Sequence, residues 1–166
     1  MRHLGYLESP HDSLGPLLCC IGQNVESLIV DTNDETLKDF HFGLPSLCRL
    51  ECQFSLGSVW NVVARLPDGS RLTDLVLTTS HHVWQFKSSG EHALGLRLEQ
   101  LVLRKLLCLS ALVVEVMVVT PRYETRLIPP LDREEVVRAI EKSMPRLTEK
   151  RILSVRFFFE KKRGLY

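Results

Sequence analysis

The chain has 166 residues, of which 45% are hydrophobic and 25% are charged, and these values predict one globular domain with a hydrophobic core. Its formal net charge is only +1, which gives no reason to expect a nucleic acid or a membrane surface as the partner. Five cysteines are an odd number in a chain of this size, which favours a reducing compartment. We therefore expect an intracellular protein of the nucleus or the cytoplasm, without a membrane partner.

The first half of the sequence predicts one helix followed by a meander of antiparallel strands. Apolar residues between 14 and 29 recur every three or four positions, as they do on one face of a helix. The following segments alternate apolar and polar residues, which is typical of half-buried strands, and "PDGS" (67–70) favours a tight hairpin turn. The four strands are expected at 48–56, 59–66, 71–78 and 81–87.

The second half predicts two helices, each followed by a strand. Residues 91–109 carry leucine on more than one side, as a buried helix does. The segment "ALVVEVMVV" (111–119) is rich in β-branched residues and predicts a central strand covered on both faces. A capping box at Asp132 begins a helix that Pro145 ends, and 152–160 is the expected final strand.

These elements predict an α+β fold in one domain covering 1–166, in the order α-β-β-β-β-α-β-α-β and without internal repeats. In this interpretation 1–13 form an extended lead-in and 161–166 form a basic tail. The helix, four-strand meander and helix over 14–109 are similar in order to the ubiquitin-conjugating and RWD family of folds. The proline motif that follows the meander in that family is absent here, and so is a candidate catalytic cysteine in that segment.

The sequence offers few candidates for metal binding or catalysis. Cys48 and Cys52, together with the pair at 81–82, are the strongest metal candidates. If both cysteines lie on one strand, their Cα atoms are roughly 13 Å apart, too far for both sulfurs to bind one zinc ion. Glycine-rich nucleotide-binding motifs are absent. We therefore expect no metal, no cofactor and no catalytic residues.

The C-terminal segment is the most distinctive part of the sequence. Residues 146–166 contain seven basic and two acidic residues, and strand alternation places Arg156 and Phe158 on one face of the last strand. The closing "EKKRGLY" resembles the short basic and aromatic peptides with which some end-joining factors dock on the Ku heterodimer. The candidate interaction residues are Arg156, Phe158, Lys161, Lys162, Arg163, Leu165 and Tyr166.

The leading functional hypothesis is a non-enzymatic protein–protein interaction domain, which acts as a subunit or adaptor of an intracellular multiprotein assembly. The partners would then be other protein subunits. The alternative is a nucleic-acid-binding module that uses the basic residues of 146–163, with Phe158 and Tyr166 available for stacking on bases. A third interpretation, an unrecognised hydrolase, requires a pocket that contains Cys52, His82 or Glu115.

Overall fold

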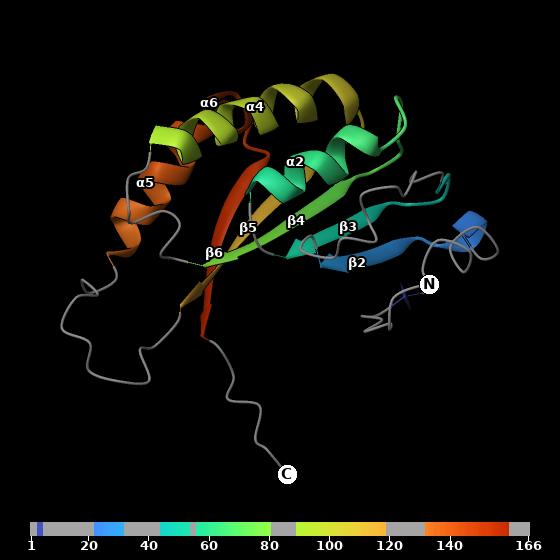
Figure 1. Ribbon diagram of the computed structural model, residues 1–166, viewed down its shortest axis with the longest axis horizontal. Coiled ribbons are helices and arrows are strands. Elements are labelled where there is room, and N and C mark those ends of the chain that lie inside the picture. The colour runs from blue at the N-terminus through green and yellow to red at the C-terminus, as the bar shows by residue number, and fades with distance from the viewer. Residues whose placement is uncertain are drawn as a thin grey trace, which may run out of the picture.

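The computed structural model describes residues 3–4, 22–31, 44–53, 56–80, 89–118 and 132–159 (Figure 1). Within these residues six strands form one sheet, and every pair of neighbouring strands is parallel. The strands lie in the order of the sequence: β1 (His3–Leu4), β2 (Ser27–Asp31), β3 (Arg49–Gln53), β4 (Asp74–Ser80), β5 (Ala111–Val118) and β6 (Leu153–Phe159). The fold is therefore α/β, and the predicted α+β fold with an antiparallel meander is wrong.

The α-helices connect successive strands and lie on one face of the sheet, as Figure 1 shows. Parallel neighbours require such a crossover, because the chain must return to the same end of the sheet before each new strand. Among the described residues, no helix covers the opposite face. In chain order the helices are the 3₁₀-helix η1 (Gly22–Asn24), α2 (Leu56–Arg65), α4 (Ser89–Lys105), α5 (Arg133–Ser143) and α6 (Pro145–Glu149).

The hydrophobic core lies between the sheet and the helices. The strand register places a leucine from each of β2 to β6 in one row across the sheet: Leu28, Leu50, Leu75, Leu112 and Leu153. The next row consists of Val30, Cys52, Leu77, Val114 and Val155. The helices complete the core with Val59, Val62 and Val63 of α2, Leu98 and Val102 of α4, Val136 and Ile140 of α5, and Leu147 of α6. Burial of this apolar surface is the main driving force for folding.

A short apolar pattern recurs at four of the strands. Each occurrence has one buried residue before or at the start of the strand, a second three positions later and a third two positions after that. The expectation of a chain without internal repeats overlooked this pattern, since its helical connections differ in sequence and length. Its occurrences are Val25, Leu28 and Val30; Leu47, Leu50 and Cys52; Leu72, Leu75 and Leu77; and Leu109, Leu112 and Val114.

The predicted strand at 59–66 is instead most of helix α2. Val59, Val62 and Val63 are buried, which is helical spacing, whereas Trp60 is 38% exposed. The turn at 67–70 is present, because Gly69 has a φ of +76° and the Ser70 amide donates to the Pro67 carbonyl at 3.2 Å. It connects a helix to a parallel strand rather than two antiparallel strands.

Other predicted elements have mixed outcomes. The strand over 27–31 replaces the end of the predicted helix at 14–29, and the predicted strand at 81–87 lies outside the described residues. Helices at α4 and α5 and strands at β3, β4, β5 and β6 are confirmed. The cap of α5 is also confirmed, since Asp132 Oδ1 accepts a hydrogen bond from the Glu135 amide at 3.0 Å. In β5, however, only alternate side chains are fully buried, so the strand is not covered equally on both faces.

Two polar side chains of α4 connect it to neighbouring helices. Glu99 is 3% exposed and accepts a hydrogen bond from the Leu147 amide in the first turn of α6 at 2.9 Å. Lys105 Nζ donates to the carbonyls of Ala64 and Leu66 at the end of α2, at 2.5 Å and 2.6 Å. These contacts use one buried and one partly buried polar side chain to fix the order and orientation of the helix layer.

Candidate interaction face

The sheet face opposite the helices is formed by the alternate residues of each strand. The register places Ile29, Glu51, Val76, Val113 and Ser154 in one row, and Thr78, Glu115 and Arg156 in the next. We call this surface the open face, because no helix covers it in the part of the chain that the structure describes (Figure 1). It consists of Ile29, Arg49, Glu51, Asp74, Val76, Thr78, Val113, Glu115, Met117, Ser154, Arg156 and Phe158.

The centre of the open face contains aliphatic side chains that are partly or fully buried. Ile29 and Val113 are half-buried, whereas Val76 between their strands is 2% exposed. On the helix side, by contrast, Leu112 and Val114 in the same strand as Val113 are both 0% exposed. The two faces of the sheet therefore differ in burial, although both are apolar at their centres.

Charged residues of both signs lie within and beside this row of side chains. Arg49 Nη2 lies 3.9 Å from Glu51 Oε2, and Glu115 is the register partner of Arg156. Partial burial raises the pKa of Glu51 above its ordinary value of 4.5, the negative charge of Glu115 raises it further, and Arg49 opposes both effects. The carboxylate of Glu51 is therefore less favourably solvated than a surface carboxylate and would gain from a cationic or hydrogen-bond donor partner.

Aromatic side chains extend from both faces of β6. Phe158 pairs in register with Met117 on the open face, where both are half-buried. On the helix side, the Arg133 guanidinium lies 5.4 Å from the ring centre of Phe157 and 5.9 Å from that of Phe159. Phe158 is thus the aromatic residue of β6 that the open face can offer to a partner.

The structure separates the predicted interaction residues. Arg156 and Phe158 both lie on the open face, which confirms the predicted alternation of β6. The other five candidates, all within 161–166, lie outside the described residues. Arg146, which the nucleic-acid hypothesis groups with Arg156, belongs to α6 on the opposite side of the sheet. Arg146 and Arg156 therefore do not share one basic surface.

The residues considered for catalysis are also separated. Cys52 points into the core under the helices, and burial raises its pKa to about 12, so its thiol stays protonated at neutral pH. Glu115 points to the other face of the sheet, so these two side chains do not line one pocket. His81 and His82 lie outside the described residues.

The metal candidates show a similar separation. Cys48 lies just before β3 and is exposed, and its Sγ donates to the Ser46 carbonyl at 3.3 Å, whereas Cys52 is buried. Within the described ranges, no group of three or more His, Cys, Asp or Glu side chains is placed to bind a metal ion.

Sequence reasoning missed most of the open face, including Arg49, Glu51 and Val113. Their grouping depends on parallel strands in sequential order, whereas the alternation of each strand reports only which residues share a face of that strand. The recurring buried pattern at successive strands was the signal that could have revealed it, since stacked repeats place equivalent residues side by side.

Comparison with known proteins finds no relative of this chain. The chain matches no protein-family model, no curated protein and no solved structure. Among the helices that the structure describes, none combines the length and the apolar character needed to cross a membrane.

Proposed function

We propose that this chain is a non-enzymatic protein-binding module that holds a partner protein on the open face. The observation that carries the proposal is an all-parallel sheet whose described helices all lie on one side. Parallel sheets almost always have both faces covered, because their strands bury apolar side chains on both sides. A partner that covers Ile29, Val113 and Phe158 would complete this arrangement.

The geometry of the repeat supports this use of the sheet. Neighbouring strands lie about 4.8 Å apart, whereas packed helices need about 8–10 Å. A stack with one strand and one helix per repeat relieves this mismatch by bending, with the strands on the inner side of the bend. The strand pattern resembles that of leucine-rich repeats, and solenoids of this kind use their concave surface for binding.

The composition of the open face suits a protein partner. Apolar side chains together with charges of both signs are common on protein interfaces. Arg49 and Arg156 are positive, whereas Glu51, Asp74 and Glu115 are negative. This mixture of signs would favour a partner with the complementary pattern and disfavour a uniformly charged polymer. These charges would contribute specificity, and Val113 and Phe158 would contribute apolar contact area.

Site-specific photo-crosslinking of the full chain in cells tests this proposal. A photoreactive residue at Ser154, which is exposed on the open face, should crosslink a discrete protein partner. The same residue at Arg138, which is exposed on α5, is the matched control and should give no crosslink to that partner.

Charge reversal then tests whether the identified partner depends on the face. Arg156→Glu should lower the affinity for that partner about tenfold, which corresponds to about 1.4 kcal/mol, and Arg138→Glu should leave it unchanged. A partner that crosslinks equally from both positions, or that binds the Arg156→Glu variant as well as the parent chain, would contradict the proposal.

A further inference from the structure

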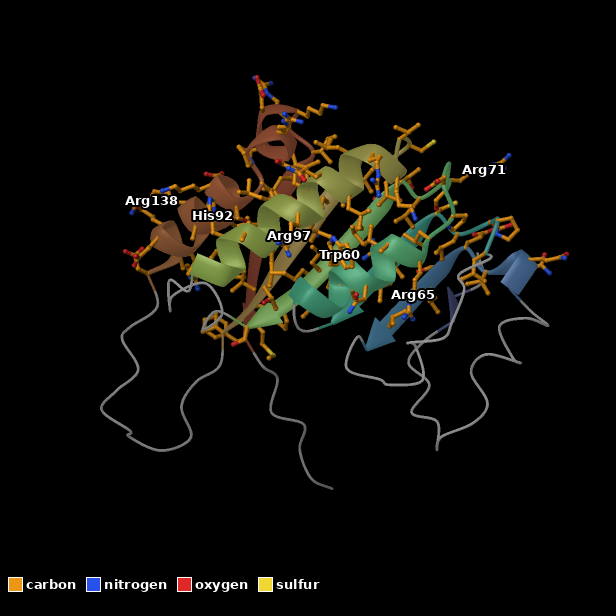
Figure 2. The ribbon with its side chains drawn as sticks, turned by 45° about the horizontal axis from the view of Figure 1, so that its top comes forward. Trp60, Arg65, Arg71, His92, Arg97 and Arg138 are labelled. Atoms are coloured by element: carbon orange, nitrogen blue, oxygen red, sulfur yellow. The ribbon has the colours of Figure 1, made fainter. Side chains whose placement is uncertain are left out.

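A second surface of a different character lies on the outer side of the helix layer. A groove of about 690 Å³ is formed where α2, α4 and α6 meet, and Figure 2 shows Trp60 of α2 and Arg97 of α4 on this side. Its volume is within the range of about 300–1,000 Å³ that is common for ligand sites. The main lining residues are Trp60, Arg97, Leu101, Leu103, Arg104 and Arg146.

The helical sequences explain why these residues meet. In α4, Leu98 and Val102 face the core at 0% and 1% exposure, so Arg97 and Arg104 project outward. In α2 the buried valines face the sheet, and Trp60 is left 38% exposed toward α4. A tryptophan exposed in a groove, rather than packed in the core, is the residue type most often found at binding hot spots.

The groove is strongly cationic and lacks internal compensation. Arg97, Arg104 and Arg146 line it without any Asp or Glu, and their guanidinium groups have no ion pair or hydrogen bond within the described residues. The carboxylate of Glu99 in α4 accepts a hydrogen bond from the Leu147 amide, and Asp68 lies 3.5 Å from Lys105 Nζ. Three like charges around one groove repel one another, and an anionic ligand would relieve that repulsion.

We propose that this groove binds a short acidic peptide segment of a protein partner. Guanidinium groups bind carboxylates through two parallel hydrogen bonds, and such charge-assisted bonds are stronger than neutral ones. Arg97 and Arg104 are two helical turns apart, about 10.5 Å along α4, a distance that an extended peptide spans in three to four residues. An apolar side chain between two acidic residues would then lie against Trp60 and Leu103.

A peptide fits this groove better than a single-stranded nucleic acid does. Proteins that bind single strands combine a continuous basic track with several aromatic residues on which successive bases stack. Here one tryptophan and three arginines converge on one groove, and the formal net charge of the chain is only +1. The proposal is independent of the open face, which lies on the other side of the sheet.

Fluorescence anisotropy with the full chain tests the proposal. The probe is a fluorescein-labelled decapeptide in which aspartate and glutamate alternate with leucine and phenylalanine. Its control replaces every acid with the corresponding amide, and a labelled oligothymidine represents nucleic acid. We expect saturable binding of the acidic peptide, binding at least tenfold weaker for the amide peptide and the oligothymidine, and a loss of affinity with added salt.

Variants place the binding in the groove. Arg97→Glu, Arg104→Glu and Arg146→Glu should each weaken binding at least tenfold, and Trp60→Ala should also weaken it. Arg71→Glu changes an exposed arginine away from the groove and is the matched control (Figure 2). Circular dichroism confirms that each variant is folded.

Four results would overturn the proposal. They are equal binding of the amide peptide, tighter binding of the oligothymidine, equal loss of affinity in Arg71→Glu, and no detectable binding of the acidic peptide at millimolar concentration. The comparison of peptides on the parent chain decides the question even if a variant does not fold. None of these results bears on a partner bound at the open face, so the two proposals fail separately.

Discussion

Glu51 shows how a single charge responds to its position on the sheet. Its side chain is 21% exposed, lies beside Arg49 and is influenced by the negative charge of Glu115 from β5. Because the pKa of Glu51 is raised in the folded chain, the folded state binds this proton more tightly than the unfolded state does. The free energy of unfolding should therefore decrease as the pH rises from below 4.5 through the raised pKa.

Glu51→Gln should remove this pH-dependent cost. We expect the variant to be more stable than the parent chain at pH 7, by less than about 1 kcal/mol because the partly exposed carboxylate is screened by solvent. At about pH 3, well below the ordinary pKa of 4.5, the carboxyl of the parent chain is protonated in both the folded and the unfolded state, and the difference should disappear. Urea unfolding at the two pH values measures it, and Glu149→Gln reports the same chemical change at an exposed site on α6. A stabilisation of equal size at both pH values would contradict the assignment.

At the scale of elements, the contact between α4 and α5 depends on a glycine. A Cβ atom added at Gly95 would lie 2.6 Å from Ser143 Cβ and 2.7 Å from its Oγ. Ser143 is 1% exposed and its hydroxyl donates to the Ile140 carbonyl at 2.7 Å, so it has little freedom to move away. Glycine inside a helix costs about 1 kcal/mol relative to alanine, and here that cost permits the close approach of the two helices.

Gly95→Ala should therefore destabilise the fold despite the better helix propensity of alanine. Overpacking costs about 1–3 kcal/mol and the gain in helix propensity is about 1 kcal/mol, so the net loss should be up to about 2 kcal/mol. Thermal and urea unfolding measure this loss. In a double-mutant cycle, Ser143→Gly removes the clashing Cβ and should recover part of the loss, whereas Ser143→Ala keeps that atom and should not. Strict additivity of Gly95→Ala and Ser143→Gly would refute the steric explanation.

The elements that could be predicted are those whose local signals agree. Asp132 supplies a cap before a clear helical stripe, and β5 combines β-branched residues with alternation. In α2 the signals conflict, because Val59, Val62 and Val63 fit a helix whereas Trp60, Val62 and Ala64 also alternate like a strand. Burial of Val59, Val62 and Val63 in the core between the helices and the sheet decides in favour of the helix.

The candidate site was harder to predict than the elements. Alternation correctly placed Arg156 and Phe158 on one face of β6, since this requires only local periodicity. That Glu115 and Glu51 share the same face depends on parallel pairing across three strands, which no local pattern specifies. The groove at Trp60 requires three helices to converge, and that arrangement arises only from tertiary packing.

At the scale of the whole molecule, the sequential strand order means that stability depends mainly on contacts between neighbouring strands. Each strand of the sheet pairs only with the strands next to it in sequence. Most stabilising contacts are therefore made between adjacent strands and the helices that connect them. Leu112 in β5 is 0% exposed and has a neighbouring strand on each side, β4 and β6. Leu153 in β6 is half-buried, and among the described strands only β5 lies beside it. Equivalent positions in the row of leucines across the sheet should therefore tolerate truncation unequally.

Leu112→Ala should cost about 3–5 kcal/mol and Leu153→Ala about 1–2 kcal/mol, because the cavity at the central position cannot be filled by solvent or by collapse of an edge. Leu112→Met preserves volume and should cost less than about 1.5 kcal/mol. Urea unfolding of the three variants tests the ranking. Equal costs for the two alanine variants would show that the sheet does not behave as a stack of neighbouring units.

The sequential order of the strands also determines how the sheet responds to a pulling force. In many domains the first and last strands are neighbours, so that a pulling force must shear many hydrogen bonds at once. Here β2 and β6 are separated by the three strands between them, as Figure 1 shows. Tension applied between β2 and β6 would break the hydrogen bonds of one strand pair at a time. The protein should therefore extend in small steps at low force.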